Sequence, residues 1–335
     1  MKQYLQKLVA KTDLSQAEMA AAFDLIMAGQ SSPAQTGAFL TALRMKGETI
    51  VELCGAAYSM RRHAVFVDTG GMPVVDTCGT GGDSLNTFNI STTAAFVAAG
   101  AGLRIAKHGN RAVTSKCGSA DVLAALGVKL EATPDVVEDC IKTVGIGFLF
   151  AQALHPAMKH AGPVRKELGI RTIFNMLGPL TNPAGARGQI LGVFSADLTE
   201  TFAAVLKELG SKRALIVHGK DGMDEITSTT STRISELRDG KITTREFDPL
   251  RFIDELAPLS ALAGGDPQTN AAITRNVLAG KTGPHRDIVC LNAAGAIIAG
   301  SKADDFETAM AMARESIDSG KAMQALDGLV KKTNS

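Results

Sequence analysis

The chain has 335 residues, of which 45% are hydrophobic and 21% charged, values ordinary for a soluble globular protein of about two domains. Its 35 basic and 34 acidic residues leave a net charge of +1, which argues against a broad nucleic-acid or membrane surface. No apolar run reaches the roughly 18 residues of a membrane span, and no signal peptide is evident. Five widely spaced cysteines form no paired motif, so we expect neither a zinc site nor disulfides, and a cytoplasmic protein.

The N-terminal part of the chain predicts helices only. Ser15 with Glu18, and Thr49 with Glu52, match the capping box that begins many helices. Apolar residues recur at helical spacing after each of these starts, and no strand pattern interrupts them. We therefore expect a small all-helical subdomain over residues 1–70.

From Val74 onward, short apolar segments alternate with helical stretches. The candidate strands are residues 74–76, 103–107, 147–150, 190–194, 214–217 and 288–291. This alternation predicts an α/β fold with a mainly parallel central sheet, made by residues 74–154 and 188–335. Residues of about 155–187 are rich in proline and glycine, and we expect them to join the helical subdomain.

A glycine-rich loop, Cys78-Gly79-Thr80-Gly81-Gly82-Asp83, directly follows the first predicted strand. Backbone amides in such a loop can close around an anion such as pyrophosphate. A dinucleotide fingerprint would need glycine in place of Ser84, and a P-loop ending at Gly280-Lys281-Thr282 would need glycine in place of Arg275. The loop is therefore either a phosphate-binding segment of another kind or an ordinary glycine-rich turn.

Polar residues gather at further points where strands are predicted to end. Asn89-Ile90-Ser91-Thr92 stands at a helix start, and Lys107-His108-Gly109-Asn110-Arg111 follows the second strand. Asp224-Glu225 follows a later strand, and adjacent carboxylates suit Mg2+. Each segment alone is also compatible with a helix cap or a surface turn. Together they predict an anion-binding site at the carboxyl ends of the strands, because these ends meet at one edge of a parallel sheet.

The order and spacing of these segments resemble the anthranilate phosphoribosyltransferase family of tryptophan biosynthesis. The resemblance rests on residues 79–83, 87–92, 107–111 and 221–225, and it covers nearly the whole chain. It implies transfer of the phosphoribosyl group of phosphoribosyl pyrophosphate (PRPP) to the amine of anthranilate, which gives N-(5-phosphoribosyl)anthranilate and pyrophosphate. It also implies a homodimer formed through the helical subdomain, two Mg2+ ions per active site, and neither nucleic-acid nor membrane partners.

The same resemblance implies a set of site residues. PRPP would lie across Gly79, Gly82, Asp83, Thr87, Asn89, Ile90, Ser91, Thr92, Lys107, His108, Gly109, Asn110, Arg111, Ala112, Val113, Thr114, Ser115 and Ser119. Anthranilate would contact Gly79, Asn110 and Arg165, and the metal ions would be held by Ser91, Asp224 and Glu225 together with pyrophosphate oxygens. Lys107 and His108 would be the catalytic residues.

Several points stay open at this level. His108 is either a positioning group or a general base, and Arg165 is expected to hold the anthranilate carboxylate through its planar fork. The rival functions are a pyrimidine nucleoside phosphorylase and a nucleic-acid-binding relative of the same fold. Cys117 stands beside Lys116 and a helix start near Ser119, which favours a thiol of lowered pKa in a loop that closes over the phosphates. The alternative is that Cys117 is a small, buried and inert residue.

Overall fold

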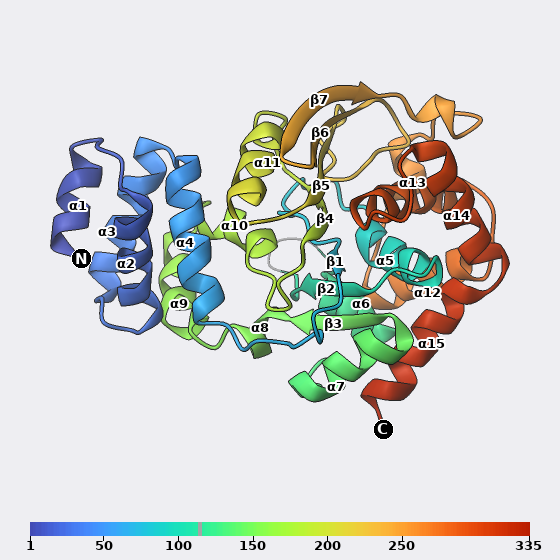
Figure 1. Cartoon of the computed structure of the whole chain (residues 1–335), viewed down its shortest axis with the longest axis horizontal. Coiled ribbons are helices and arrows are strands. Elements are labelled where there is room, and N and C mark those ends of the chain that lie inside the picture. The colour runs from blue at the N-terminus through green and yellow to red at the C-terminus, as the bar shows by residue number, and fades with distance from the viewer. Residues whose placement is uncertain (113–115) are drawn as a thin grey trace.

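The structure is a computed structural model that describes residues 1–112 and 116–335, so the expectations for Val113, Thr114 and Ser115 lie outside the described residues. A bundle of helices stands on one side of a larger α/β body (Figure 1). The bundle contains α1 (Lys2–Val9), α2 (Gln16–Met27), α3 (Pro33–Lys46) and α4 (Ile50–Arg62). This arrangement confirms the predicted fold class, a small all-helical subdomain beside an α/β domain.

The bundle helices begin where their capping residues predict. The Ser15 side chain accepts a hydrogen bond from the backbone N–H of Glu18, whose side chain accepts one from the Ser15 N–H. Thr49 and Glu52 make the same reciprocal pair at the start of α4. Both capping boxes predicted from the sequence are therefore present, and each satisfies N–H groups that have no partner inside the helix.

The α/β body is built around one seven-stranded sheet. Its strands are β1 (Val75–Asp76), β2 (Ile105–Gly109), β3 (Ile146–Phe150), β4 (Gly188–Gly192), β5 (Arg213–Gly219), β6 (Thr232–Arg238) and β7 (Lys241–Phe247). They lie in the order β3-β2-β1-β4-β5-β6-β7. The neighbours from β3 to β5 are parallel, whereas β6 and β7 are antiparallel to the strands beside them. The carboxyl ends of β1 to β5 therefore share one edge.

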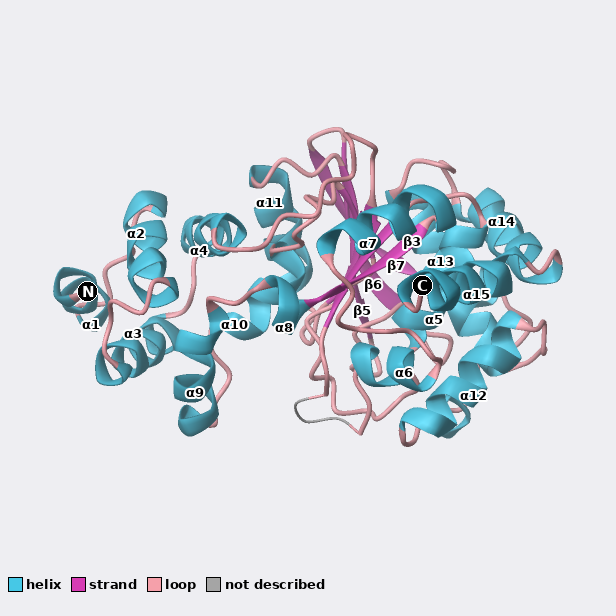
Figure 2. Ribbon diagram, turned by 90° about the horizontal axis from the view of Figure 1, so that it is seen from below, coloured by secondary structure: helices cyan, strands magenta, loops and turns pink. Residues whose placement is uncertain are grey.

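Helices cover both faces of the sheet. The remaining ones are α5 (Ile90–Gly100), α6 (Ser119–Ala125), α7 (Pro134–Asp139), α8 (Ala151–Leu154), α9 (Met158–Leu168), α10 (Phe174–Leu177), α11 (Leu198–Glu208), α12 (Pro267–Leu278), α13 (Pro284–Ala299), α14 (Phe306–Asp318) and α15 (Lys321–Thr333). Short helical turns of other types are η1 (Cys140–Val144), η2 (Gly178–Leu180), η3 (Pro249–Arg251) and η4 (Leu259–Leu262). Figure 2 shows the strands between the bundle on one side and the helices α5 and α12 to α15 on the other.

Alternating side chains of β5 fill two separate cores. On β5, Leu215 and Val217 pack with the apolar residues of α5 and α13. Ala214 and Ile216 face the other way, into a core shared with α11 and the bundle. This alternation is the period of two expected for a strand buried on both faces.

Residues 155–187 run beside the bundle. Their helix α9 packs on α2 and α3, and α10 packs on α4. The Phe174 ring of α10 lies 5.4 Å from the Phe23 ring of α2, measured between centroids. Helices far apart in the sequence thus share one apolar core with the bundle.

One predicted strand is wrong, and one pair of strands was not predicted. Residues 288–291 lie inside α13, because a short apolar run shows no period that separates a strand from a buried helix. The hairpin of β6 and β7 was not predicted, although Asp239-Gly240 joins these strands with φ values of 50° and 76°. An Asp-Gly pair between alternating segments is a strong hairpin signal, so the sequence does carry the information that specifies this hairpin.

No helix within the two described ranges is both long enough and apolar enough to cross a membrane.

Candidate active site

A cavity of about 620 Å3 opens at the carboxyl ends of the parallel strands. Every predicted site residue that the structure describes lines it. These residues are Gly79, Gly82, Asp83, Thr87, Asn89, Ile90, Ser91, Thr92, Lys107, His108, Gly109, Asn110, Arg111, Ala112, Ser119, Arg165, Asp224 and Glu225. The fold therefore brings together segments that are more than 100 positions apart in the chain, such as residues 79–83 and 224–225.

The glycine loop between β1 and α5 takes a conformation that glycine favours. Gly81 and Gly82 have φ values of 66° and 85°, in the left-handed region where other residues are strained. The Thr80 N–H donates to the carbonyl of Gly192, 2.8 Å away at the end of β4. A side chain at Gly79 would place its Cβ 3.3 Å from Oδ2 of Asp224. The loop thus needs glycine both for its shape and for its close approach to the acidic residues.

Three carboxylates crowd one part of the cavity. Glu225 accepts a hydrogen bond through Oε1 from the Ser91 N–H, 3.1 Å away in the first turn of α5. Enclosure by protein atoms raises the pKa of Asp224, and neighbouring Asp83 raises it further. Enclosure also raises the pKa of Glu225, with Asp224 as the second cause. Raised values mean that the free protein does not fully compensate these negative charges.

Lys107 is a buried cation whose charge acts on this acidic group. Its side chain is only 3% exposed and donates to the carbonyl and hydroxyl of Thr77, at 3.3 and 3.0 Å. Its charge lowers the pKa of Glu225 and of the buried Asp76, while burial holds the Asp76 pKa at about 6. The ammonium therefore lies at Thr77, just before the glycine loop, and its charge partly balances the acids.

His108 is held in one tautomer by its neighbours. Its Nδ1 lies 3.1 Å from the carbonyl oxygen of Gly178, which can only accept, so Nδ1 carries the proton. Burial lowers the pKa of His108 to about 3, with His155 as the second cause, so the ring is neutral near pH 7. Its Nε2 lies 3.2 Å from Nε2 of His155, which must then donate to it. The lone pair of His108 is thereby occupied.

The side chains of Asp76, Cys78 and His108 also lie close enough together, within 4.8 Å, to resemble a metal site. Asp76 accepts hydrogen bonds from the backbone N–H of His108 at 3.1 Å and from the side-chain amide of Asn182 at 2.7 Å. Both carboxylate oxygens of Asp76 and both ring nitrogens of His108 therefore already bind protein groups. The cluster is structural for this reason.

Arg165 reaches the cavity from α9, on the side of the bundle. Its guanidinium lies 5.1 Å from the centre of the Phe174 ring, and desolvation lowers its pKa. Asn110 lies on the rim, where its Oδ1 accepts from the Arg111 N–H at 2.8 Å and from Gln152 at 3.2 Å. A planar cation above an aromatic ring is a suitable partner for a flat carboxylate.

Among the cavity residues that the sequence analysis did not predict, three make contacts that matter to the site. His155 follows β3 and lies 47 positions from its partner His108, so only the fold brings the two together. Arg171 donates through Nη2 to the Gly82 carbonyl at 2.5 Å, which ties residues 155–187 to the glycine loop. Asn292 does give a sequence signal, since it is a lone amide within the apolar stretch of α13.

The prediction for Cys117 is wrong in its chemistry. The residue is 8% exposed, and burial raises the pKa of its thiol to about 11, despite the nearby helix start. Desolvation of the thiolate thus outweighs the expected electrostatic help, and Cys117 is a small buried residue. The loop that it was expected to report on lies partly outside the described residues.

Comparison with known proteins agrees with this geometry. Residues 2–64 match the helical bundle domain of the glycosyl transferase family, and residues 71–323 match its a/b domain. Anthranilate phosphoribosyltransferase from Syntrophobacter fumaroxidans is 54% identical over 330 residues, which is 98% of each chain.

Solved structures extend the likeness to three dimensions. The crystal structure of anthranilate phosphoribosyltransferase from Thermus thermophilus aligns with a TM-score of 0.94 at 42% identity, covering 99% of each chain. The Saccharomyces cerevisiae enzyme in complex with PRPP and Mg aligns with a TM-score of 0.90 at 31% identity, covering 99% of this chain and 97% of that one. The chain therefore belongs to the anthranilate phosphoribosyltransferases, enzymes of the glycosyl transferase family.

Proposed function

We propose that the chain transfers the phosphoribosyl group of PRPP to the amine of anthranilate and releases pyrophosphate, the second step of tryptophan biosynthesis from chorismate. One observation carries this proposal. A glycine loop, a helix start and three carboxylates meet in a cavity that also holds Arg165. The first three features suit a metal-bound pyrophosphate, and the arginine suits the carboxylate of the second substrate.

Ser91, Asp224 and Glu225 would hold Mg2+. They offer the oxygen ligands that Mg2+ prefers, and the raised pKa values of the two acids reflect negative charge that a cation would offset. When bound, Mg2+ neutralises charge on the pyrophosphate leaving group. The proposal includes two ions per site, because three carboxylates and a pyrophosphate carry far more charge than Lys107 balances.

The remaining help from the protein is electrostatic and positional. Departure of pyrophosphate leaves positive charge on the ribose and negative charge on the leaving group. The backbone dipoles of the glycine loop and the positive end of α5 would face the phosphates without having to reorganise. The segment of residues 107–112 and Ser119 would surround the phosphoribosyl group, and the charge of Lys107 would offset part of the negative charge of the acidic residues and of the leaving group.

His108 acts as a positioning group in this proposal. The attacking amine of anthranilate is already neutral near pH 7, so it needs no strong base before attack. The occupied Nε2 lone pair and the pKa of about 3 both argue against proton abstraction by His108. Its ring would instead shape the wall of the cavity beside the amine.

Anthranilate would enter from the side of the bundle. Arg165 would hold its carboxylate through two parallel N–H donors, with Gly79 and Asn110 as further contacts. The carboxylate and amine are neighbours on the anthranilate ring, so fixing the first orients the second toward the ribose.

The proposal also covers assembly and compartment. A homodimer through the helical subdomain would cover Val9 and Met45, which are 75% and 81% exposed although apolar. All five cysteines are free thiols, which suits the reducing cytoplasm. Analytical ultracentrifugation of the purified chain tests the dimer directly, and a monomer at micromolar concentration contradicts it.

Loss of anthranilate fluorescence in the presence of PRPP and Mg2+ tests the reaction. We expect a signal that needs all three components. A parallel assay with thymidine and phosphate tests the rival nucleoside phosphorylase, and turnover there without turnover of anthranilate would overturn the proposed function.

A further inference from the structure

The loop that carries Asp224 and Glu225 joins β5 to β6 and contains no helix or strand of its own. Two adjacent acids near a third repel one another, so the backbone must be fixed from outside to keep them together. Glu225 has one such anchor in the Ser91 N–H. The backbone itself is fixed by two side chains, which act on either side of the acidic pair.

The first is Asn292, in the middle of α13. Its Oδ1 accepts from the Ile226 N–H, and its Nδ2 donates to the Ile226 carbonyl, both at 2.9 Å. Ile226 directly follows Glu225, so the first contact fixes the peptide group between these two residues, and the second fixes the next peptide group along the chain. Nδ2 also donates to the carbonyl of Ile288 at 2.9 Å, and Asn292 is only 1% exposed. A fully engaged buried amide holds its orientation firmly.

The second is Asp221, which precedes the acidic pair. Its Oδ1 accepts from the Met223 N–H at 3.0 Å. Its Oδ2 accepts from the hydroxyls of Thr227 and Thr229, at 2.7 and 2.5 Å. Asp221 therefore links the residue just before the acidic pair to residues just after it, and closes the loop around them.

Close packing removes the remaining freedom. A Cβ on Gly192 would collide with the backbone oxygen of Asp224, so the loop lies directly on the end of β4. A Cβ on Gly219 would collide with Oδ1 of Asp221. The loop thus packs closely against two glycines. It is also held by the side chains of Asn292 and Asp221, which are not among the proposed metal ligands.

We infer that Asn292 and Asp221 are positioning residues that hold Asp224 and Glu225 in the arrangement that binds the metal. The inference rests on the proposed function, because it takes a divalent cation as the ligand of that pair. Partners that orient metal ligands commonly contribute about ten- to a hundredfold to metal affinity.

Binding of Mn2+ to the whole protein in the presence of PRPP, followed by electron paramagnetic resonance, tests the inference. Asn292→Ala and Asp221→Ala should each weaken Mn2+ binding by about tenfold or more. The Mg2+ concentration for half-maximal activity should rise by a similar factor, while kcat at saturating Mg2+ stays within about threefold of wild type. Asp221→Asn should recover much of the affinity, because the amide oxygen still accepts from the Met223 N–H.

Ser316→Ala is the matched control for a buried polar deletion. The Ser316 hydroxyl is 1% exposed and donates at 2.7 Å to the carbonyl of Val97, in a contact between α14 and α5. This variant should lose thermal stability and keep wild-type Mn2+ affinity.

Folded Asn292 and Asp221 variants that bind Mn2+ like wild type would overturn the inference, as would a loss of kcat with unchanged metal dependence. If Asn292→Ala does not fold, the comparison of Asp221→Ala with Asp221→Asn decides. Failure of the unmodified chain to bind Mn2+ with PRPP would instead overturn the proposed function, and this inference with it.

Discussion

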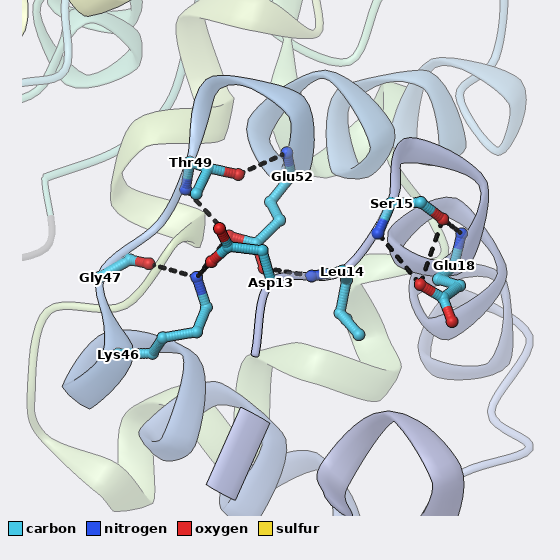
Figure 3. A network of polar contacts seen from close by, with 8 residues as sticks. All are labelled: Asp13, Leu14, Ser15, Glu18, Lys46, Gly47, Thr49 and Glu52. Atoms are coloured by element: carbon cyan, nitrogen blue, oxygen red, sulfur yellow. Dashed lines mark hydrogen bonds and ion pairs between the residues drawn. The ribbon is translucent and has the colours of Figure 1, made fainter. Parts of the chain in front are cut away.

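Two groups of acidic residues in this molecule have opposite relations to their surroundings. Glu52 in the bundle is 0% exposed, and protein donors occupy both of its oxygens (Figure 3). Oε1 accepts from the Leu14 N–H at 3.0 Å, and Oε2 accepts from Lys46 and from the Thr49 N–H, both at 2.9 Å. Because its charge is matched, Glu52 ties three segments of the bundle into one unit.

In the cavity, by contrast, protein groups offset the charge of the acids only in part. Asp83, Asp224 and Glu225 lie together at the strand ends, and enclosure raises the pKa of the last two. A carboxylate matched by protein donors contributes to folding, whereas unmatched carboxylates cost folding free energy and favour binding of a cation. Whether protein donors match the charge of a buried carboxylate therefore distinguishes a structural acid from a functional one.

The largest effect should come from removing a functional acid. Asp224→Asn should lower turnover by about a hundredfold or more, because the lost charge reduces stabilisation of the leaving group. Its free energy of unfolding without ligand should equal or exceed that of wild type at neutral pH. Steady-state kinetics and urea unfolding check the two halves of the prediction, and wild-type turnover at limiting Mg2+ would contradict it.

Removing the structural acid should reverse this pattern. Glu52→Ala should destabilise the protein by about 3–5 kcal/mol, because it leaves Lys46 and two N–H groups of the bundle without their buried partner. Asp13→Ala is the control, since Asp13 also pairs with Lys46 but is 65% exposed, and should cost less than about 1 kcal/mol. Equal unfolding midpoints for the two variants would show that Glu52 does not hold the bundle together.

The same comparison of matched and unmatched charges applies to a cation, Arg165. It stacks on Phe174 and has no acidic partner within hydrogen-bonding range in the described part of the chain, so its charge also awaits a ligand. Arg165→Ala should raise the KM for anthranilate about tenfold or more and change that for PRPP much less. Arg165→Lys should restore only part of the loss, because an ammonium lacks the planar fork. An unchanged KM for anthranilate would remove Arg165 from the site.

The smallest effect should be a pH dependence of stability. A carboxyl group whose pKa is raised in the folded state binds more protons there than in the unfolded chain. Its contribution to stability is therefore lost as pH rises from the ordinary carboxyl range through the folded pKa. Without ligand, wild type should lose stability relative to Asp224→Asn as pH rises from about 4, the ordinary range of an aspartate, through the folded pKa of Asp224 of about 7.

Measuring the difference between the two proteins removes the effects of groups that do not interact with Asp224. The difference keeps the contribution of Asp224 and that of Glu225, whose pKa Asp224 raises. Asp76, His108 and His155 also have shifted pKa values, but they contribute to both proteins and largely cancel. Urea unfolding at several pH values gives the difference directly. Parallel curves for wild type and Asp224→Asn would mean that the carboxyl of Asp224 is not under strain in the free protein.

The sequence predicted features whose causes are local. Capping boxes identify the bundle helices, because their hydrogen bonds join residues three positions apart. The residues at the strand ends were predicted to meet because parallel strands end at a common edge. The apolar run 288–291 was misread, because its environment is set by the sheet on which α13 packs rather than by its own pattern.

The residues that hold the site residues in place were harder to predict than the site residues themselves. Asn292 lies 66 positions from Ile226, and His155 lies 47 positions from His108. Contacts of this kind depend on how α13 and α8 are placed against the sheet, and one sequence gives no direct sign of that placement. The thiol of Cys117 was misjudged for the same reason, since its burial decides its pKa.

The most direct test of the account is calorimetric titration of PRPP into the free wild-type protein, with and without Mg2+. The account predicts tight binding only when Mg2+ is present, because the phosphates would otherwise face three carboxylates whose charge the protein offsets only in part. Asp224→Asn should make binding weaker with Mg2+ and less dependent on it. Equal affinity of the wild-type protein for PRPP in the presence and absence of Mg2+ would contradict the central claim.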